Sequence, residues 1–201
     1  MIKHHSLKHG TLVIARHGES RLNALNRFSG WLDITLNKKG LDEAHRVADH
    51  CQHFDYDTAF TSRLERAHET LSVILSHQKK IGVFQHKEDH RYNHLKKTPK
   101  KFVHEILPVF TSENLNERSY GDLQGLDKNV ASQMFGTVKV LKWRRDFKER
   151  PPGGESLKRP ECKKEFSGLL KSMSFGAREV RPHHDQAVCR DRFSGIIHKS
   201  L

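Results

Sequence analysis

The sequence predicts an α/β fold with a mainly parallel sheet, because short apolar runs alternate along the chain with amphipathic segments. The first run, Thr11–Ala15, is rich in β-branched residues and predicts a buried strand. A second buried strand is predicted at Asp57–Thr61. Apolar residues repeat at helical spacing over 41–51 and 64–75. Strand, helix, strand and helix in this order are typical of parallel strands joined by crossover helices.

The two predicted helices each have one apolar face. The first follows Gly40, and its apolar residues are Leu41, Ala44, Val47, Ala48 and Cys51. The second follows Ser62-Arg-Leu-Glu65, which has the spacing of a capping box. Its apolar residues are Leu64, Ala67, Leu71, Ile74 and Leu75. Residues 77–110 are rich in Lys and His and show little periodicity until Phe102–Phe110, so we interpret them as a basic surface insertion with at most one short helix.

The chain has 201 residues, which suits one domain of ordinary size. We expect a catalytic core over 1–158 and a tail over 159–201 whose pattern predicts no structure. The net charge of +12 is compatible with a solvated basic surface, a nucleic acid, an anionic membrane or a small polyanionic substrate. The three cysteines lie far apart, and no signal peptide or membrane-length apolar run is present, so a cytoplasmic location is expected.

A histidine directly after the first predicted strand is the strongest candidate for chemistry. Arg16-His17-Gly18-Glu19 stands where open α/β sheets commonly place catalytic residues. A neutral imidazole can attack phosphorus if its other nitrogen is held in one tautomer, and Gly18 would let a backbone carbonyl come close. An isolated Arg-His-Gly triplet could equally hold a structural histidine. The flanking Arg16 and Glu19, with Asn23 following, favour the catalytic interpretation.

Basic side chains suited to a phosphoryl group are spread along the chain. Phosphoryl transfer is catalysed mainly by positioning and electrostatic stabilisation, and the planar arginine fork pairs with two oxygens at once. The candidates are Arg16, Arg66, Arg144 and Arg145. Taken alone, Arg66 could be a solvated helix residue, and Arg144-Arg145 could be an ordinary basic doublet.

The segment from Leu115 to Gly121 brings a carboxylate, an arginine and a phenol together. Glu117 can act as a general acid or base for a substrate hydroxyl, or it can form a surface ion pair with Arg118. Tyr120 is either a core residue with a solvated hydroxyl or a phosphate ligand. Lys128 is placed to reach a substrate carboxylate.

Six motifs occur in one order along the chain. They are Leu-Val-Ile-Ala-Arg-His-Gly-Glu-Ser, Asn-Arg-Phe-Ser-Gly-Trp, Phe-Thr-Ser-x-x-x-Arg-Ala, Leu-Asn-Glu-Arg-x-Tyr-Gly-Asp-Leu-Gln-Gly-Leu, Trp-Arg-Arg and Pro-Pro-Gly-Gly-Glu-Ser-Leu. This order resembles the 2,3-bisphosphoglycerate-dependent phosphoglycerate mutases of the histidine phosphatase superfamily. The resemblance covers roughly residues 11–75 and 113–157. It implies a three-layer α/β sandwich whose mainly parallel sheet is flanked by helices.

The resemblance also implies roles for individual residues. The catalytic set would be His17 as the phosphohistidine, Arg16 and Arg66 on the transferred phosphoryl group, and Glu117 as the proton donor and acceptor. The substrate-binding set would be Asn23, Ser29, Gly30, Tyr120, Lys128, Arg144 and Arg145. The implied activity interconverts 3-phosphoglycerate and 2-phosphoglycerate in glycolysis and gluconeogenesis. It uses 2,3-bisphosphoglycerate as the phosphoryl primer, and no metal.

The resemblance ends after the Gly-Glu-Ser-Leu motif. Members of the family continue with a helix, a core strand and an Ala-His-Gly-Asn-Ser motif that carries a second active-site histidine. Residues 159–201 do not match these features, and Pro160 stands where the expected helix needs an N–H. His183-His184 follows Pro182 without a preceding apolar strand. The sheet is therefore expected to be incomplete at its C-terminal end, and the chain is expected to be a poor mutase.

Other functions stay open at this stage. A poorly closed phosphohistidine site could act as a bisphosphoglycerate phosphatase or synthase. The unmatched tail would also suit an inactive remnant or a binding protein. Nucleic-acid binding is disfavoured, because a small phosphorylated carboxylate substrate already accounts for four or five of the basic residues. We therefore expect that substrate as the partner, no nucleic acid and no membrane, and a homodimer or homotetramer as in relatives.

Overall fold

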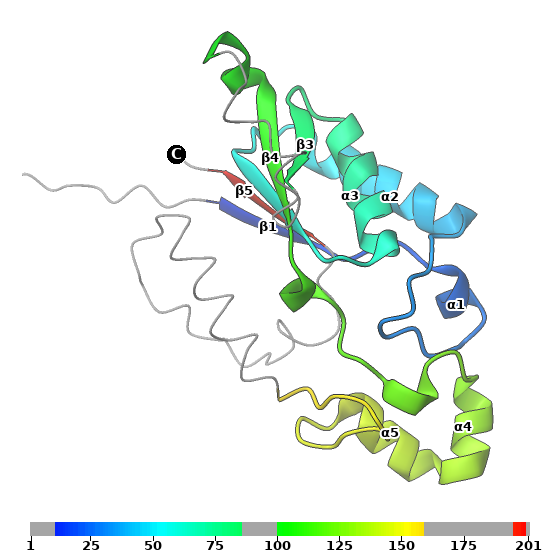
Figure 1. Ribbon diagram of the computed structural model, residues 1–201. Coiled ribbons are helices and arrows are strands. Elements are labelled where there is room, and N and C mark those ends of the chain that lie inside the picture. Colours follow the sequence, from blue (N-terminus) through cyan, green and yellow to red (C-terminus); the bar gives the residue numbers. More distant parts are fainter. Residues whose placement is uncertain (1–10, 86–99, 159–194, 200–201) are drawn as a thin grey trace, which may run out of the picture.

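The computed structural model describes residues 11–85, 100–158 and 195–199 (Figure 1). The strands of these residues form one sheet of five, in the order β1-β5-β2-β4-β3. They are β1 (Thr11–Ala15), β2 (Thr58–Thr61), β3 (Ile81–Gln85), β4 (Ile106–Thr111) and β5 (Gly195–Lys199). β2, β4 and β3 pair in parallel, whereas β5 runs antiparallel between β1 and β2. The predicted α/β fold with a mainly parallel sheet is confirmed.

The strand β3 and all of β4 except Thr111 lie inside residues 77–110, the segment that the sequence assigns to a surface insertion. Leu107 and Val109 of β4 are fully buried, so this segment belongs to the core. The prediction of an insertion over 77–110 is wrong for both strands. Pro108 hides β4 in the sequence, because a proline within an apolar run normally argues against a central strand. Residues 86–99 lie outside the described part of the chain.

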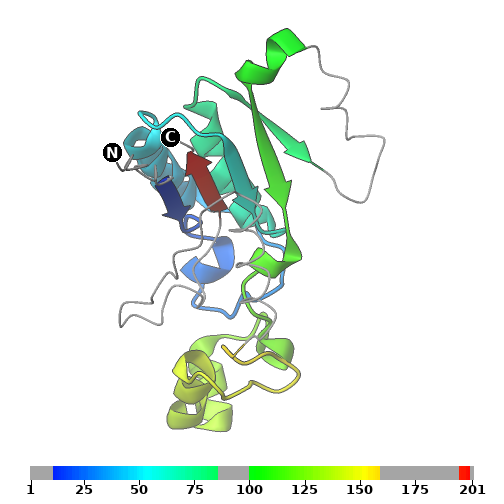
Figure 2. The same ribbon diagram turned by 90° about the vertical axis from the view of Figure 1, so that its left-hand side faces the viewer.

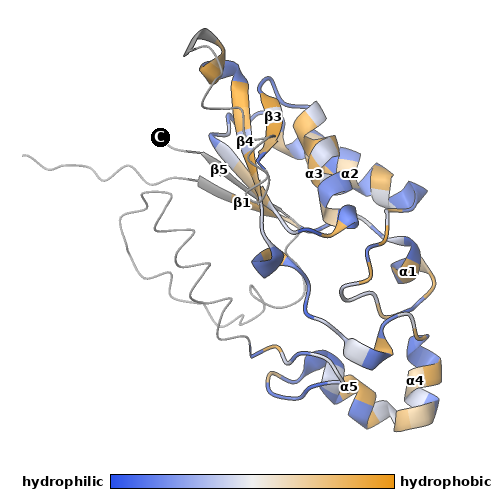
Figure 3. Cartoon of the chain, viewed as in Figure 1, coloured by the Kyte–Doolittle hydropathy of each residue, from blue (hydrophilic) through white to orange (hydrophobic). Residues whose placement is uncertain are grey.

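The helices α2 (Lys38–Cys51) and α3 (Glu65–Ser76) pack side by side on one face of the sheet (Figures 1 and 2). Their predicted apolar faces are buried, except that Leu41 is 40% exposed and Val47 is half-buried. The core therefore lies between these helices and the strands, where Figure 3 shows apolar residues on β3, β4 and α3. The predicted capping box does not form, because α3 begins at Glu65 with Leu64 as its N-cap.

A helical unit, formed by α4 (Lys128–Phe135) and α5 (Thr137–Arg145), lies beyond the carboxyl ends of β2 and β4 (Figures 1 and 2). A second core joins it to the rest of the chain; its buried members are Phe28, Tyr120, Leu123, Ala131, Val140 and Trp143. The short helices are α1 (Arg21–Ala24) and the 3-10 turns Lys100–Glu105, Glu113–Leu115 and Gly121–Leu123. Residues of the site can thus come from both the sheet and the helical unit.

The strand β5 comes from the tail for which the sequence predicts no structure. Ile197 pairs with Val13 of β1 on one side and with Ala59 of β2 on the other. A strand of the tail thus lies inside the described sheet, between the edge strand β1 and β2, and runs antiparallel to both. His183 and His184 lie outside the described residues. Among the helices of the described residues, none has the length and apolar character needed to span a membrane.

Candidate active site

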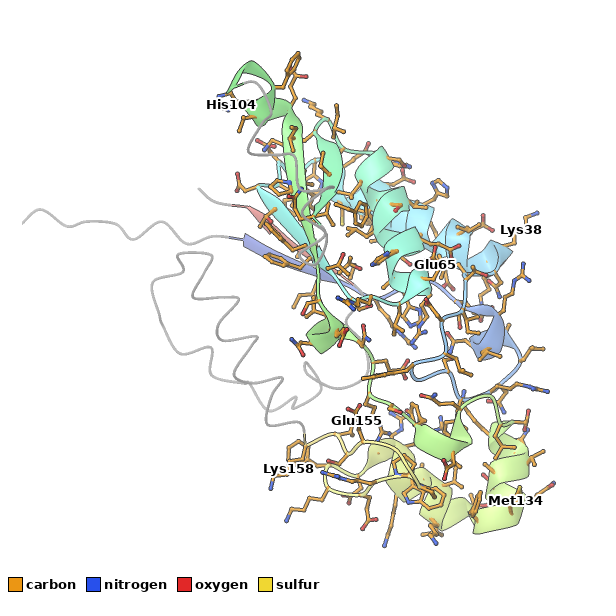
Figure 4. The ribbon with its side chains drawn as sticks, in the orientation of Figure 1. Lys38, Glu65, His104, Met134, Glu155 and Lys158 are labelled. Carbon is orange, nitrogen blue, oxygen red and sulfur yellow. The ribbon has the colours of Figure 1, made fainter. Side chains whose placement is uncertain are left out.

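The site is built where the chain leaves the carboxyl ends of the strands. His17 follows β1, Arg66 lies in the first turn of α3 after β2, and Glu117 follows β4. Open α/β sheets commonly collect ligand-binding residues at this edge. Figure 4 draws the side chains between the sheet and the helical unit and labels Glu155, which lies in this region.

The imidazole of His17 is held at both nitrogens. Nδ1 lies 2.7 Å from the carbonyl oxygen of Gly18, and since that oxygen can only accept, Nδ1 carries the proton. The Nε–H of Arg66 donates to Nε2 at 3.2 Å, so Nε2 presents its lone pair toward the arginine. The hold by a backbone carbonyl that the sequence suggests is therefore present, and Nε2 is the nitrogen available to attack phosphorus.

The electrostatic surroundings of His17 favour its neutral form. Burial lowers the pKa of His17 to about 4, and the nearby charges of Arg66 and Arg16 act in the same direction. The Gly18 carbonyl opposes this shift, because it accepts a hydrogen bond from the ring. A neutral imidazole keeps the lone pair that a nucleophile needs.

The lowered pKa predicts an unusual pH profile. We expect the acid limb of kcat/KM for phosphorylation of His17 near pH 4, because kcat/KM reports the ionisation of the free enzyme. Between about pH 6.5 and 4 the unfolded chain binds a proton at this position that the folded chain does not bind, so stability should fall as the pH falls. Rates and thermal denaturation measured across this range check both effects, with His17→Asn as the control for stability. An acid limb near pH 6.5 would contradict the prediction.

Arg66 is the buried centre of the site. The residue is 1% exposed, and its guanidinium donates to four groups: His17 Nε2, the carbonyls of Leu32 and Gly30, and a carboxylate oxygen of Glu117. The distances to the Leu32 and Gly30 oxygens are 3.1 and 2.9 Å. The alternative that Arg66 is a solvated helix residue is therefore wrong. Arg66 fixes the histidine, the loop at residues 30–32 and the carboxylate relative to one another.

Glu117 forms its ion pair with Arg66 at 2.9 Å, and its side chain is 20% exposed. Arg118 points elsewhere: its guanidinium donates to the backbone carbonyls of Trp143 and Glu155 at 2.5 and 3.2 Å. The ion pair between Glu117 and Arg118 that the sequence leaves open is thus replaced by the pair with Arg66. The carboxylate lies beside the arginine that also contacts His17, as proton transfer next to a phosphoryl site requires.

The loop at residues 29–31 approaches the segment after β4 closely. Gly30 has φ +54°, and a Cβ there would lie 2.3 Å from Oε1 of Gln124. That Oε1 accepts a hydrogen bond from the backbone N–H of Trp31 at 2.8 Å, and the Trp31 indole donates to the Glu117 carbonyl at 2.6 Å. Ser29 is buried, and its hydroxyl has no hydrogen-bond partner in the part of the chain that the structure describes.

The helical unit contributes positive charge. Burial lowers the pKa of Lys128, and the charges of Arg144 and Arg16 lower it further, whereas Glu117 opposes them. These groups therefore lie close enough to act on one another across the gap between the sheet and the helical unit. Arg144 is half-buried and Arg145 is exposed at the end of α5. The nearby guanidinium groups that lower the pKa of Lys128 form with it a positively charged cluster, which is suited to a polyanionic ligand.

Two predicted substrate ligands have structural contacts as well. The Tyr120 ring is 8% exposed, packs on Phe28 at 5.0 Å and lies 4.5 Å from the Arg118 guanidinium, which favours the interpretation as a core residue. Oδ1 of Asn23 accepts from the N–H and the hydroxyl of Ser20 and completes a capping box at α1. Their substrate contacts, like the other assigned roles, stay predictions.

Sequence reasoning missed two polar residues that tie these segments together. Gln124 accepts hydrogen bonds from Trp31, Ser119 and Tyr120 through one oxygen. Thr70 contacts the backbone of Gly18 and of Arg66. Thr70 stands four residues after Arg66, so helical periodicity could have placed it on the same face.

A sequence profile of the histidine phosphatase superfamily (branch 1) matches residues 12–90 and 97–161. The chain belongs to this superfamily. It is 43% identical over 166 residues to a 2,3-bisphosphoglycerate-dependent phosphoglycerate mutase from Methanosarcina acetivorans, a match that covers 73% of this chain and 65% of that protein. It is 42% identical over 149 residues to the mutase of the same name from Pseudoalteromonas atlantica, with the same coverage of 73% and 65%.

Solved structures share the fold. The structure of a mycobacterial glucosyl-3-phosphoglycerate phosphatase with VO3 superposes with a TM-score of 0.61 and 22% identity, over 83% of this chain and 66% of that one.

The chain spans a little under two thirds of the length of the curated mutases that it matches. Within the predicted insertion at residues 77–110, the profile leaves only residues 91–96 unmatched. An insertion relative to the family is therefore limited to those six residues.

Proposed function

We propose that this chain is a phosphoglycerate mutase that works through a phosphohistidine on His17 and is primed by 2,3-bisphosphoglycerate. The observation that carries the proposal is the contact of Arg66 with both His17 Nε2 and Glu117, at 3.2 and 2.9 Å. The contact brings His17, Arg66 and Glu117 into one group, which supports their proposed roles as nucleophile, phosphoryl-stabilising cation and proton carrier. The names of the relatives that are about 40% identical support the substrate and the primer.

The proposed reaction proceeds in two half-reactions on one site. In the first, phosphorylated His17 gives its group to the free hydroxyl of a monophosphoglycerate: the N–P bond breaks, a P–O bond forms, and the Glu117 carboxylate accepts the hydroxyl proton. In the second, Nε2 of His17 attacks the other phosphate of the bisphosphoglycerate, and Glu117 returns the proton to the leaving oxygen. Arg66 and Arg16 stabilise the charge that spreads over the transferred oxygens.

The cations of the helical unit would bind the remainder of the substrate. Lys128, Arg144 and Arg145 would pair with the carboxylate and the second phosphate, and Ser29 and Gly30 would contact the substrate from the loop at residues 29–31. Exclusion of water matters, because a phosphohistidine exposed to water hydrolyses.

Incubation with 2,3-bisphosphoglycerate labelled on phosphorus tests the proposal. The wild-type chain should take up acid-labile label and convert 3-phosphoglycerate to 2-phosphoglycerate only when the primer is added. His17→Ala should take up no label, whereas His53→Ala, which changes an exposed histidine, should be labelled like the wild type. Release of inorganic phosphate without 2-phosphoglycerate would replace the mutase with a phosphatase, and absence of label would leave an inactive remnant.

A further inference from the structure

Helix α3 contacts the His17 segment at two points, one turn apart. Arg66 reaches Nε2 of the imidazole through its side chain. Thr70, which is 2% exposed, accepts a hydrogen bond from the backbone N–H of Gly18 at 3.1 Å. Residues at positions i and i+4 of a helix lie on the same face, so one face of α3 contacts both the His17 ring and the backbone that follows it.

The Thr70 hydroxyl is oriented by the helix itself. Its hydrogen is donated to the carbonyl of Arg66 at 2.8 Å, which leaves a lone pair of Oγ1 directed at Gly18. The peptide on the other side of Gly18 carries the carbonyl that accepts the Nδ1–H of His17 at 2.7 Å. A chain of three hydrogen bonds therefore runs from Arg66 through Thr70 and Gly18 to the histidine ring.

The backbone of Gly18 has little freedom on its other side. A Cβ at Gly18 would lie 2.1 Å from the carbonyl oxygen of Gly40, so the two glycines bring their backbones into direct contact. Gly18 is thus held between the start of α2 and Thr70. Within the part of the chain that the structure describes, the side chain that binds the Gly18 N–H is that of Thr70.

We propose that Thr70 is a positioning residue for phosphoryl transfer: by binding the N–H of Gly18 it fixes the Gly18 backbone, so that the Gly18 carbonyl holds the His17 ring with Nε2 facing Arg66. The proposal rests on the proposed function of His17 and goes beyond the residues assigned to it. Thr70 is buried and its hydroxyl contacts backbone groups, so we expect it to affect the rate of transfer and to leave substrate binding unchanged.

Two substitutions separate the hydroxyl from the shape of the side chain. Thr70→Val keeps the volume and removes both hydrogen bonds, whereas Thr70→Ser keeps the hydroxyl and removes a methyl group. In single-turnover labelling, we expect Thr70→Val to phosphorylate His17 about ten- to a hundredfold more slowly, the usual consequence of a misplaced reacting group, with KM unchanged. Thr70→Ser should regain most of the rate. Ile74→Val, a buried change on the next turn of α3, controls for loosened packing and should keep the rate.

Hydrogen exchange of the Gly18 amide provides a readout that does not need enzyme activity. The amide should be protected in the wild type and in Thr70→Ser, and it should exchange faster in Thr70→Val while the amides of α2 keep their protection. A Thr70→Val rate equal to that of the wild type, or unchanged protection of Gly18, would overturn the positioning role. If the wild type takes up no label, the proposed function fails, and amide exchange together with the ¹⁵N shifts of the His17 ring still decides whether Thr70 holds the imidazole.

Discussion

Replacement of Arg66 by lysine is expected to slow phosphorylation of His17 by about a hundred- to a thousandfold, the cost of removing one preorganised donor from a charged transition state. A lysine carries one compact charge and cannot donate at once to His17, Glu117 and the carbonyls of Gly30 and Leu32. The loss should appear mainly in kcat, because the contact with His17 acts on the group in transfer. Single-turnover labelling of the purified variant measures it.

Arg63 provides a matched control on the same stretch of chain. Its guanidinium pairs with Glu113 at the surface, and the Arg63 side chain is 43% exposed. Exposed ion pairs contribute little, so Arg63→Lys should phosphorylate at nearly the wild-type rate. If Arg66→Lys stays within tenfold of the wild type, the guanidinium does not act on the phosphoryl group, and its role is limited to holding the loop.

The sequence predicts this site unevenly. His17 is recognisable because a strand, an arginine and a glycine surround it, and Glu117 because its motif is specific. The partners of Arg66 are not recognisable, since the carbonyls of Gly30 and Leu32 belong to a loop that only the tertiary fold brings to α3. Backbone acceptors and buried hydroxyls such as Thr70 have no sequence signature. The charged residues Arg66 and Glu117, in contrast, belong to motifs that can be recognised in the sequence.

The sequence likewise predicts some helices and strands of the fold and misses others. Helical periodicity identified α2 and α3, because each buries one face against the sheet. β4 was hidden, because its apolar run contains Pro108 and follows a basic stretch. β5 could not be predicted from Gly-Ile-Ile-His-Lys, since five residues with two apolar positions have no periodicity long enough to decide.

Replacement of Ile197 by proline is expected to destabilise the protein strongly, because β5 has a neighbour on each side. Ile197 pairs with Val13 of β1 and with Ala59 of β2, so its N–H faces a neighbouring strand, and proline has no N–H to donate there. An acceptor left unpaired in a sheet interior costs about 1–3 kcal/mol. We therefore expect a clear fall in Tm. Lys38→Pro is the control, because the first position of α2 tolerates proline.

This substitution should also impair the site, because β1 is an edge strand of the described sheet and its ladder partner there is β5. Loss of β5 would release the strand that leads into His17, while Arg66 and Thr70 stay on α3. Phosphorylation should then fall even at temperatures where circular dichroism shows that α2 and α3 remain folded.

If Ile197→Pro keeps both the Tm and the labelling rate of the wild type, β5 does not support β1, and the sheet is incomplete at the C-terminal end as the sequence alone predicts. A Tm that falls while labelling at low temperature is unchanged would show that β1 and α3 position His17 without this strand.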